Sequence, residues 1–232
     1  MVKLHKSDNI LLLLDRLQQN IIPLNPDYII LFTAYNNRIY FDPSIFWSID
    51  KFLSEHIWLV TLIKEWIGVH YLRDVDSLKY NLEGPMDISK VNKRVRDYRN
   101  KLEEFNMICK KNNISLIVGT QPHWLPKAYK NFKDLQNRKV VRRVKEKIES
   151  LGKATHYENQ YIQMALFNFE MIDFANDNNL LLFDGISIFP KTRDNYFLDQ
   201  IHLNQNGSKI LANNLFDFLV DKKVIYNSLS TQ

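Results

Sequence analysis

Three short apolar runs constrain the fold of this 232-residue chain more than any other feature of its sequence. The runs cover residues 28–32, 114–118 and 180–183, and polar or turn-forming residues bound each of them. A short and continuously apolar run is typical of a strand that is buried on both faces, as strands in parallel sheets are. Because long helical stretches separate the runs, the sequence predicts a three-layer α/β sandwich with a parallel sheet.

The segments outside these runs contain stretches with the periodicity of a helix. In the longest interval, apolar residues recur every three or four positions and therefore share one helix face: Val91, Val95, Tyr98, Leu102, Phe105 and Ile108. The expected helices cover residues 8–21, roughly 87–111, about 134–150, about 155–176 and a last segment that starts near residue 206. The basic residues between 138 and 147 are typical of a solvated helix face, and a contact with phosphate or an acidic surface is the alternative.

Composition excludes several classes of protein. Hydrophobic residues make up 45% and aromatic residues 12% of the chain, which is enough for a globular core. The single cysteine, Cys109, excludes a disulfide framework, and six glycines argue against a glycine-rich phosphate loop. A formal net charge of +5 is too small to indicate nucleic-acid binding by itself.

Candidate chemistry lies where the predicted strands end, because parallel α/β sheets bind their ligands at the carboxyl ends of the strands. These ends are residues 33–37, 119–123 and 184–202. In the last of them, Asp199 precedes His202 by three residues, so its carboxylate could accept a hydrogen bond from the imidazole and hold one tautomer. The alternative is a loop aspartate and a helix-flanking histidine without a chemical role. No metal-ligand spacing is present in the sequence.

Two segments carry a resemblance to a known family. Pro26-Asp27, the apolar run and Asn36-Asn37 resemble the Pro-Asp, strand, Gly-x-Asn-Asp segment of the SGNH (GDSL-type) hydrolases. Residues 197–207, with Asp199, His202 and Gly207, resemble the terminal Asp-x-x-His-x-x-x-x-Gly block of that family. The resemblance covers about residues 8–220 and implies a flavodoxin-like fold in a single domain.

The resemblance also implies a site and a reaction. By position, His202 would be the general base, Asp199 its orienting carboxylate and Asn36 a donor in the oxyanion hole. Asn37 and His123 are candidates for the wall of the pocket. The implied substrate is a small-molecule ester or acylated compound, with no cofactor, no metal and no nucleic acid.

The sequence departs from the family pattern at the nucleophile. Neither a Gly-Asp-Ser motif nor a Gly-x-Ser-x-Gly elbow occurs, so the nucleophile is unknown, and Ser7 looks like a helix N-cap. Ala34 and Asn37 also replace the glycine and aspartate that the family has there. We therefore expect residues 1–232 to form an SGNH-like domain that is incomplete at its N-terminal side.

Three functions stay open at this point. The first is a Ser-His-Asp ester hydrolase whose serine is absent from this chain, which alone would be inactive. The second is a catalytically inactive SGNH-like binding or assembly protein. The third is an α/β module without ester chemistry, in which Asp199 and His202 are structural.

Two further segments are expected to make contacts of their own. Residues 38–86 are predicted to be a helical insertion, and the apolar cluster between 45 and 67 indicates internal packing or contact with a membrane surface or a protein. If the sheet lacks its first strands, the strand at 28–32 has an exposed edge. Such an edge favours pairing with another strand.

Overall fold

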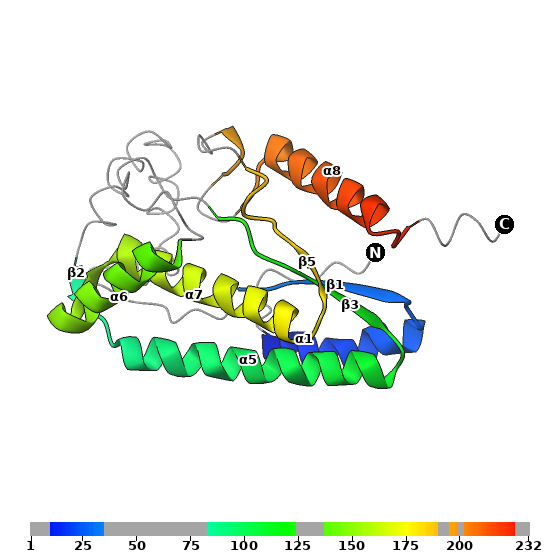
Figure 1. Ribbon diagram of the computed structural model, residues 1–232, viewed down its shortest axis with the longest axis horizontal. Coiled ribbons are helices and arrows are strands. Elements are labelled where there is room, and N and C mark those ends of the chain that lie inside the picture. The colour runs from blue at the N-terminus through cyan, green and yellow to red at the C-terminus, as the bar shows by residue number, and fades with distance from the viewer. Residues whose placement is uncertain (1–9, 35–82, 124–136, 190–194, 199–201, 226–232) are drawn as a thin grey trace, which may run out of the picture.

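A parallel sheet of three strands lies at the centre of the protein (Figure 1). The computed structural model describes residues 10–34, 83–123, 137–189, 195–198 and 202–225. The strands are β1 (Tyr28–Phe32), β3 (Ser115–Gly119) and β5 (Leu181–Phe183), and they lie in the order β1-β3-β5. Both pairings are parallel, with Leu31 beside Val118 and Val118 beside Leu182. The predicted strands and the parallel sheet are therefore confirmed.

Helices surround this sheet in the predicted order. The first, α1 (Ile10–Arg16), continues through a π-helical turn and a 3-10 turn as far as Leu24. The other helices are α5 (Ile88–Lys111), α6 (Arg138–Leu151), α7 (His156–Asp177) and α8 (Gln205–Asp221). Each lies within a few residues of its predicted bounds. α8 lies on the opposite side of the sheet from α1 and α5, so the layers are helix, sheet and helix (Figure 1).

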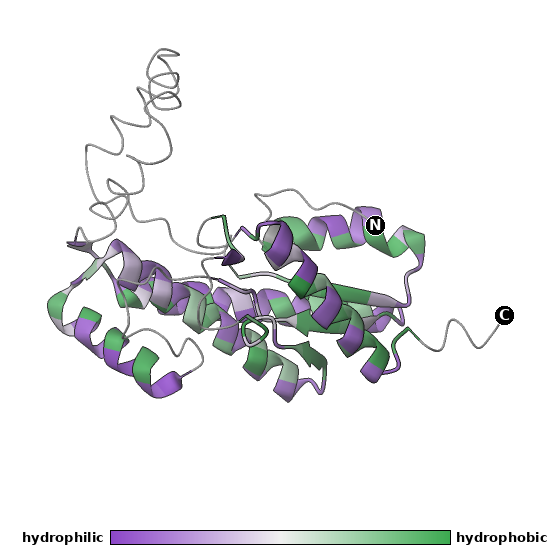
Figure 2. Cartoon of the chain, turned by 90° about the horizontal axis from the view of Figure 1, so that it is seen from above, coloured by the Kyte–Doolittle hydropathy of each residue, from purple (hydrophilic) through white to green (hydrophobic). Residues whose placement is uncertain are grey.

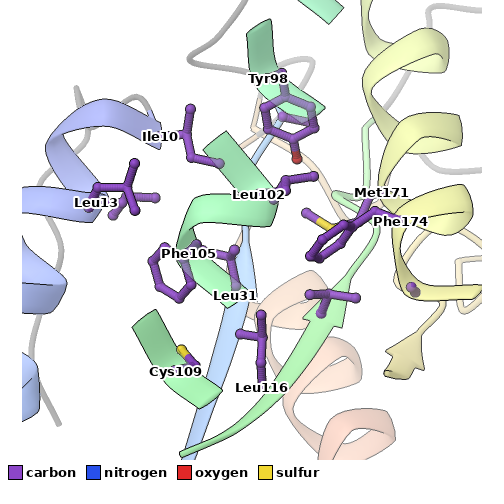
Figure 3. Packing of buried hydrophobic residues seen from close by; sticks show 14 of the residues in the cluster. Ile10, Leu13, Leu31, Tyr98, Leu102, Phe105, Cys109, Leu116, Met171 and Phe174 are labelled. Atoms are coloured by element: carbon purple, nitrogen blue, oxygen red, sulfur yellow. The ribbon is translucent and has the colours of Figure 1, made fainter. Parts of the chain in front are cut away.

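The larger core lies between the sheet and the helices α1, α5 and α7 (Figure 3). On the sheet, Leu31, Leu116 and Val118 point toward this core. The apolar face predicted for α5 supplies Tyr98 and Leu102, which are both almost completely buried. Hydrophobic residues run along the strands, whereas the helices alternate hydrophobic with hydrophilic residues (Figure 2). The predicted helix periodicity thus identifies the faces that are buried.

The opposite face of the sheet is covered by aromatic side chains and α8. The ring of Phe183 meets Phe32 edge to face, with 5.7 Å between the centroids, and meets Phe218 of α8 at 5.4 Å. Gly119 leaves room for this arrangement, because a Cβ atom there would overlap the ring of Phe32. A larger residue at this position would therefore displace the ring of Phe32 from its contact with Phe183.

A second and smaller sheet was not predicted from the sequence. β2 (Glu83–Pro85) pairs antiparallel with β4 (Lys153–Thr155), and Lys153 forms an ion pair with Glu83. Residues 83–85 belong to the helical insertion expected at 38–86, and they form a strand and not a helix. β2 and β4 border a second core formed by α6 with parts of α5 and α7. Three-residue strands are too short to show an alternating pattern.

The edge of β1 carries exposed apolar side chains. Among the described residues, β1 pairs only with β3, and Tyr28 and Ile30 are 40% and 36% exposed. The prediction that this strand is buried on both faces is therefore wrong, because only the face that carries Leu31 packs into the main core. The predicted pairing at residues 28–32 stays a prediction.

The insertion at residues 38–82 and the predicted contact surface at 45–67 lie outside the described residues. Within the described chain, no helix combines the length and apolarity that crossing a membrane requires.

A capping box and an ion pair stabilise the start of α7. The Thr155 hydroxyl accepts from the Glu158 N–H at 3.1 Å, and the Glu158 carboxylate accepts from the Thr155 N–H at 2.9 Å. Lys147 of α6 donates to the same carboxylate at 2.6 Å. Burial alone would raise the pKa of Glu158, but the bonds from Lys147 and Thr155 outweigh it and lower the pKa. Part of the basic face of α6 is thus paired with α7.

We predict that neighbouring residues of β1 respond differently to truncation. Leu31→Ala should lower the free energy of unfolding by about 2–5 kcal/mol, because it opens a cavity in the main core. Ile30→Ala should cost only about 1 kcal/mol, because that side chain is partly exposed already. Urea unfolding measures both changes. Equal losses would show that the faces of β1 are assigned wrongly.

A second prediction concerns the carboxylate at the start of α7. Glu158→Gln should cost about 1–2 kcal/mol at pH 7, because the bond to Lys147 is no longer charged on both sides. A carboxyl whose pKa is lowered by folding contributes stability above its unfolded pKa and loses it as the pH falls through the folded pKa. The gap between wild type and variant should therefore narrow below about pH 4.5. Unfolding midpoints measured from pH 7 to pH 3.5 test this.

The matched control is Glu149→Gln on α6. That carboxylate lies 3.9 Å from Lys145 and is largely exposed, so the change should have almost no effect. A gap for Glu158→Gln that stays constant with pH would contradict the proposed role of the charge.

Candidate functional site

The carboxyl ends of the three parallel strands meet at one edge of the sheet. β1 leads into Thr33 and Ala34, β3 leads into Thr120, and β5 leads into Asp184. Thr33, Ala34 and Thr120 are buried. This is the edge at which open α/β sheets bind ligands, and it is where the sequence places its candidate residues.

A tyrosine hydroxyl holds the chain that leaves β1. Tyr98 of α5 is buried, and its hydroxyl donates to the carbonyl oxygen of Thr33. Burial raises the pKa of Tyr98, so its hydroxyl keeps its proton and stays a donor. The predicted oxyanion donor Asn36 and the pocket candidate Asn37 follow shortly after Thr33. Both lie outside the described residues, so their roles stay predictions.

A threonine hydroxyl joins the end of β3 to the end of β5. Thr120 donates to the carboxylate of Asp184 at 3.0 Å and accepts from the N–H of Ile186 at 3.2 Å. The other oxygen of Asp184 accepts from the hydroxyl of Ser187 at 2.6 Å. Gly185 permits this close approach, because a Cβ atom there would overlap the carbonyl oxygen of Thr120. The first turn after β5 is thereby tied to the neighbouring strand.

His123 lies at this edge and is only 2% exposed. Its Nδ1 atom is 3.3 Å from the carbonyl oxygen of Gln121. A carbonyl oxygen accepts only, so this contact forms a hydrogen bond when Nδ1 carries the proton. A histidine in this tautomer keeps Nε2 as an acceptor. The role of His123 in a pocket wall stays a prediction.

The motif histidine ends a narrow reversal of the chain. Phe197 and Leu203 form an antiparallel bridge, and the Leu198 N–H donates to the His202 carbonyl oxygen at 2.7 Å. The described residues on either side of 199–201 are therefore antiparallel to each other. His202 is half-buried and lies three residues before the first residue of α8. Asp199 lies outside the described residues, so its hydrogen bond to His202 stays a prediction.

Asn204 and Gly207 dock the start of α8 onto this reversal. The Asn204 side chain caps α8 by accepting from the Gly207 N–H at 2.9 Å, and it donates to the carbonyl oxygen of Asn195 at 2.7 Å. A Cβ atom on Gly207 would overlap the carbonyl oxygen of Tyr196. The glycine of the motif thus allows the helix backbone to approach the chain before His202.

Other chemistry at the described residues is limited. Cys109 is buried in the main core, and burial raises the pKa of its thiol to about 11. It therefore remains a thiol at neutral pH rather than the nucleophilic thiolate. Where the structure describes the chain, no three His, Cys, Asp or Glu side chains gather in a way that could hold a metal ion.

Sequence reasoning missed four residues that organise this edge: Tyr98, Thr120, Asn168 and Asp184. Tyr98 was assigned only to the apolar face of its helix. Asn168 stands within Ala165–Phe169, where it is the only polar residue, and it is only 1% exposed. A polar side chain in an apolar helix segment indicates a buried hydrogen bond, because burying an unpaired amide is costly. That signal could have identified Asn168.

We predict that the motif glycine is required for stability. Gly207→Ala should lower the free energy of unfolding by about 1–3 kcal/mol, because the new methyl group forces α8 away from Tyr196. Asn206→Ala is the control, since that side chain is exposed in the first turn of the same helix. Thermal unfolding of both variants makes the comparison. A Gly207→Ala variant as stable as wild type would contradict the close contact.

Comparisons with known proteins agree with the architecture. No protein-family model and no curated protein matches the sequence. The structure is similar to LAE5, an alpha/beta hydrolase enzyme from the metagenome of Lake Arreo in Spain, with a TM-score of 0.50 and 13% identity over 91% of this chain and 68% of the other.

It is also similar to a GDSL-like lipase from Bacteroides thetaiotaomicron. That comparison has a TM-score of 0.50 and 10% identity, and it covers 93% of this chain and 73% of the lipase. Identities this low establish the fold and not the reaction. The chain therefore has the three-layer α/β fold with a parallel sheet that the sequence predicted, and it shares this architecture with these two proteins.

Proposed function

We propose that this chain contributes the base and the oxyanion donor of a serine ester hydrolase. His202 accepts the proton of the nucleophile, Asp199 orients the imidazole, and Asn36 donates to the developing oxyanion. The serine is supplied from outside these 232 residues. The substrate is a small-molecule ester or acylated compound.

The proposed reaction is acyl transfer in two steps. The serine oxygen bonds to the ester carbonyl carbon while its proton passes to His202, and the alcohol then leaves with that proton. Water attacks the acyl-serine, giving its proton to His202, which returns it to the serine oxygen as the acid leaves. In both steps the amide of Asn36 donates a hydrogen bond to the negative oxygen. Stabilisation of this charge is usually the largest source of rate enhancement in such sites.

One observation carries this proposal. The Phe197–Leu203 bridge and the bond from the Leu198 N–H to the His202 carbonyl oxygen fix the backbone of His202 in the segment that precedes α8. The motif places Asp199 in the same segment, three residues before His202. The fold similarity to an α/β hydrolase and a GDSL-like lipase supports the same function for that segment.

A second function is favoured by a different observation. The sequence has neither a Gly-Asp-Ser motif nor a Gly-x-Ser-x-Gly elbow, and the buried Cys109 is no substitute nucleophile. A catalytically inactive SGNH-like binding or assembly protein would look like this. In that case, His202 and Asp199 would serve only to shape the turn before α8.

We predict that turnover needs both an added serine and His202. The 232-residue chain should not hydrolyse p-nitrophenyl acetate, whereas a form extended by the sequence that precedes Met1 in its gene should do so. His202→Ala in the extended form should lower kcat/KM by at least about 10³-fold, because the general base is lost. Initial rates with p-nitrophenyl acetate and butyrate measure this.

His156→Ala is the matched control, since that histidine begins α7 and bonds to Gln160 of the same helix at 2.5 Å. It should change the rate only slightly. An extended form that folds but does not turn over ester would favour the inactive protein. Activity of the short chain that survives His202→Ala would refute the site assignment.

A further inference from the structure

Asn168 of α7 makes a two-point contact with the loop that follows β3. Its side-chain oxygen accepts from the Gln121 N–H at 2.9 Å, and its side-chain nitrogen donates to the Gln121 carbonyl oxygen at 3.2 Å. The asparagine is 1% exposed, so these bonds form away from water. One amide therefore satisfies both polar groups of one residue's backbone, as a neighbouring strand would do.

The position of this contact in the sheet gives it its importance. The last bond that ties β3 to β5 here is from the Thr120 N–H to the Phe183 carbonyl oxygen at 3.1 Å. At Gln121, one residue further along, the backbone bonds to the side chain of Asn168 and not to a neighbouring strand. A peptide group that is shielded from water and lacks a hydrogen-bond partner is unfavourable, so the amide of Asn168 favours the loop conformation in which both bonds form.

The same carbonyl oxygen also faces the candidate histidine. Gln121 O accepts from Asn168 and lies 3.3 Å from Nδ1 of His123. The direction of the Gln121 peptide therefore decides where the imidazole finds its acceptor. It also favours the tautomer with the proton on Nδ1. A change at Asn168 reaches His123 through Gln121.

We propose that Asn168 is a positioning residue of the site, acting through Gln121 to hold the β3 loop and to set the orientation and tautomer of His123. The proposal rests on the proposed function, because it assigns the loop to a pocket that binds an ester. Tyr98 holds the loop after β1 and Thr120 holds the turn after β5. Asn168 supplies the corresponding support between them.

Asn168→Asp tests this proposal, because the carboxyl group has nearly the same shape as the amide. When protonated it both donates and accepts, and when ionised it only accepts. Burial raises the pKa of such a carboxyl, so both bonds to Gln121 should persist at low pH. As the pH rises through that pKa, the bond donated to the Gln121 carbonyl oxygen should be lost, whereas the bond from the Gln121 N–H should remain. His123 and Asp184 are other ionisable side chains at this edge. The same pH series is therefore recorded on wild type, and changes that occur in both proteins are not assigned to residue 168.

Nuclear magnetic resonance measures the effect without ester turnover. In the variant, the carbonyl carbon shift of Gln121 should change between low and neutral pH, because its oxygen loses the donor at residue 168 while the Gln121 N–H keeps its acceptor. The imidazole nitrogen shifts of His123 should change over the same range. A measurement on wild type does not depend on whether the variant folds. In wild type, the Gln121 N–H and the side-chain amide of Asn168 should exchange only with global unfolding.

Asn106→Asp is the matched control. Asn106 is also a buried asparagine and donates to the side chain of Asn178 at 2.9 Å, where the C-terminal ends of α5 and α7 meet. It should destabilise the protein without moving the Gln121 and His123 signals. Fast exchange in wild type, or equal shifts of these signals in both variants, would overturn the proposal.

Catalysis separates this proposal from the proposed function. In the extended form, Asn168→Asp should lower kcat/KM at neutral pH by about 10–100-fold, as expected when a wall of the site is misplaced. Full activity together with altered Gln121 and His123 signals would refute the positioning role and leave the ester hydrolase standing. If the extended form without substitutions does not hydrolyse ester, while Asn168→Asp still alters the Gln121 and His123 signals, the hydrolase is refuted and the structural link from Asn168 to His123 is kept.

Discussion

The packing of α5 and α7 against one face of the parallel sheet is the interaction on which the rest of the structure depends. Tyr98 of α5 and Phe167 of α7 meet edge to face with 5.0 Å between their centroids, and Leu102 and Phe174 are completely buried beside them. Because this packing fixes the position of both helices on the sheet, the Tyr98 hydroxyl bonds to Thr33 and the side-chain amide of Asn168 bonds to Gln121. The apolar core thereby positions the polar edge.

Charged groups reinforce the same helix pair at its surface. Arg99 of α5 bonds to Glu170 at 3.2 Å and to Asp177 at 2.9 Å, and its guanidinium lies 5.3 Å from the ring centroid of Phe174. Burial raises the pKa of Glu170, and the bond from Arg99 opposes that rise without cancelling it. Such partly exposed pairs contribute little energy each, but they link the two helices that support the candidate site.

Much of the architecture could be predicted because it follows from local patterns. The apolar runs became strands, and the periodic residues of α5 became its buried face. β2 and β4 could not be predicted, since three residues that include Gly84-Pro85 also look like a turn, and they form a sheet only when distant segments meet. For the site, the motif and the strand ends made His202 and His123 candidates, and their roles stay predictions. Asn36, Asn37 and Asp199 lie outside the described residues.

The sequence by itself determined the order of the helices and of the three strands of the parallel sheet, and the motif of Asp199, His202 and Gly207. Only the tertiary structure decided that Asn168 supports Gln121, that Thr120 ties β3 to Asp184, and that Gly207 lies against Tyr196. The reason is physical. Periodicity is a property of neighbouring residues, whereas a hydrogen-bond partner or a close backbone contact exists only once remote segments have packed together.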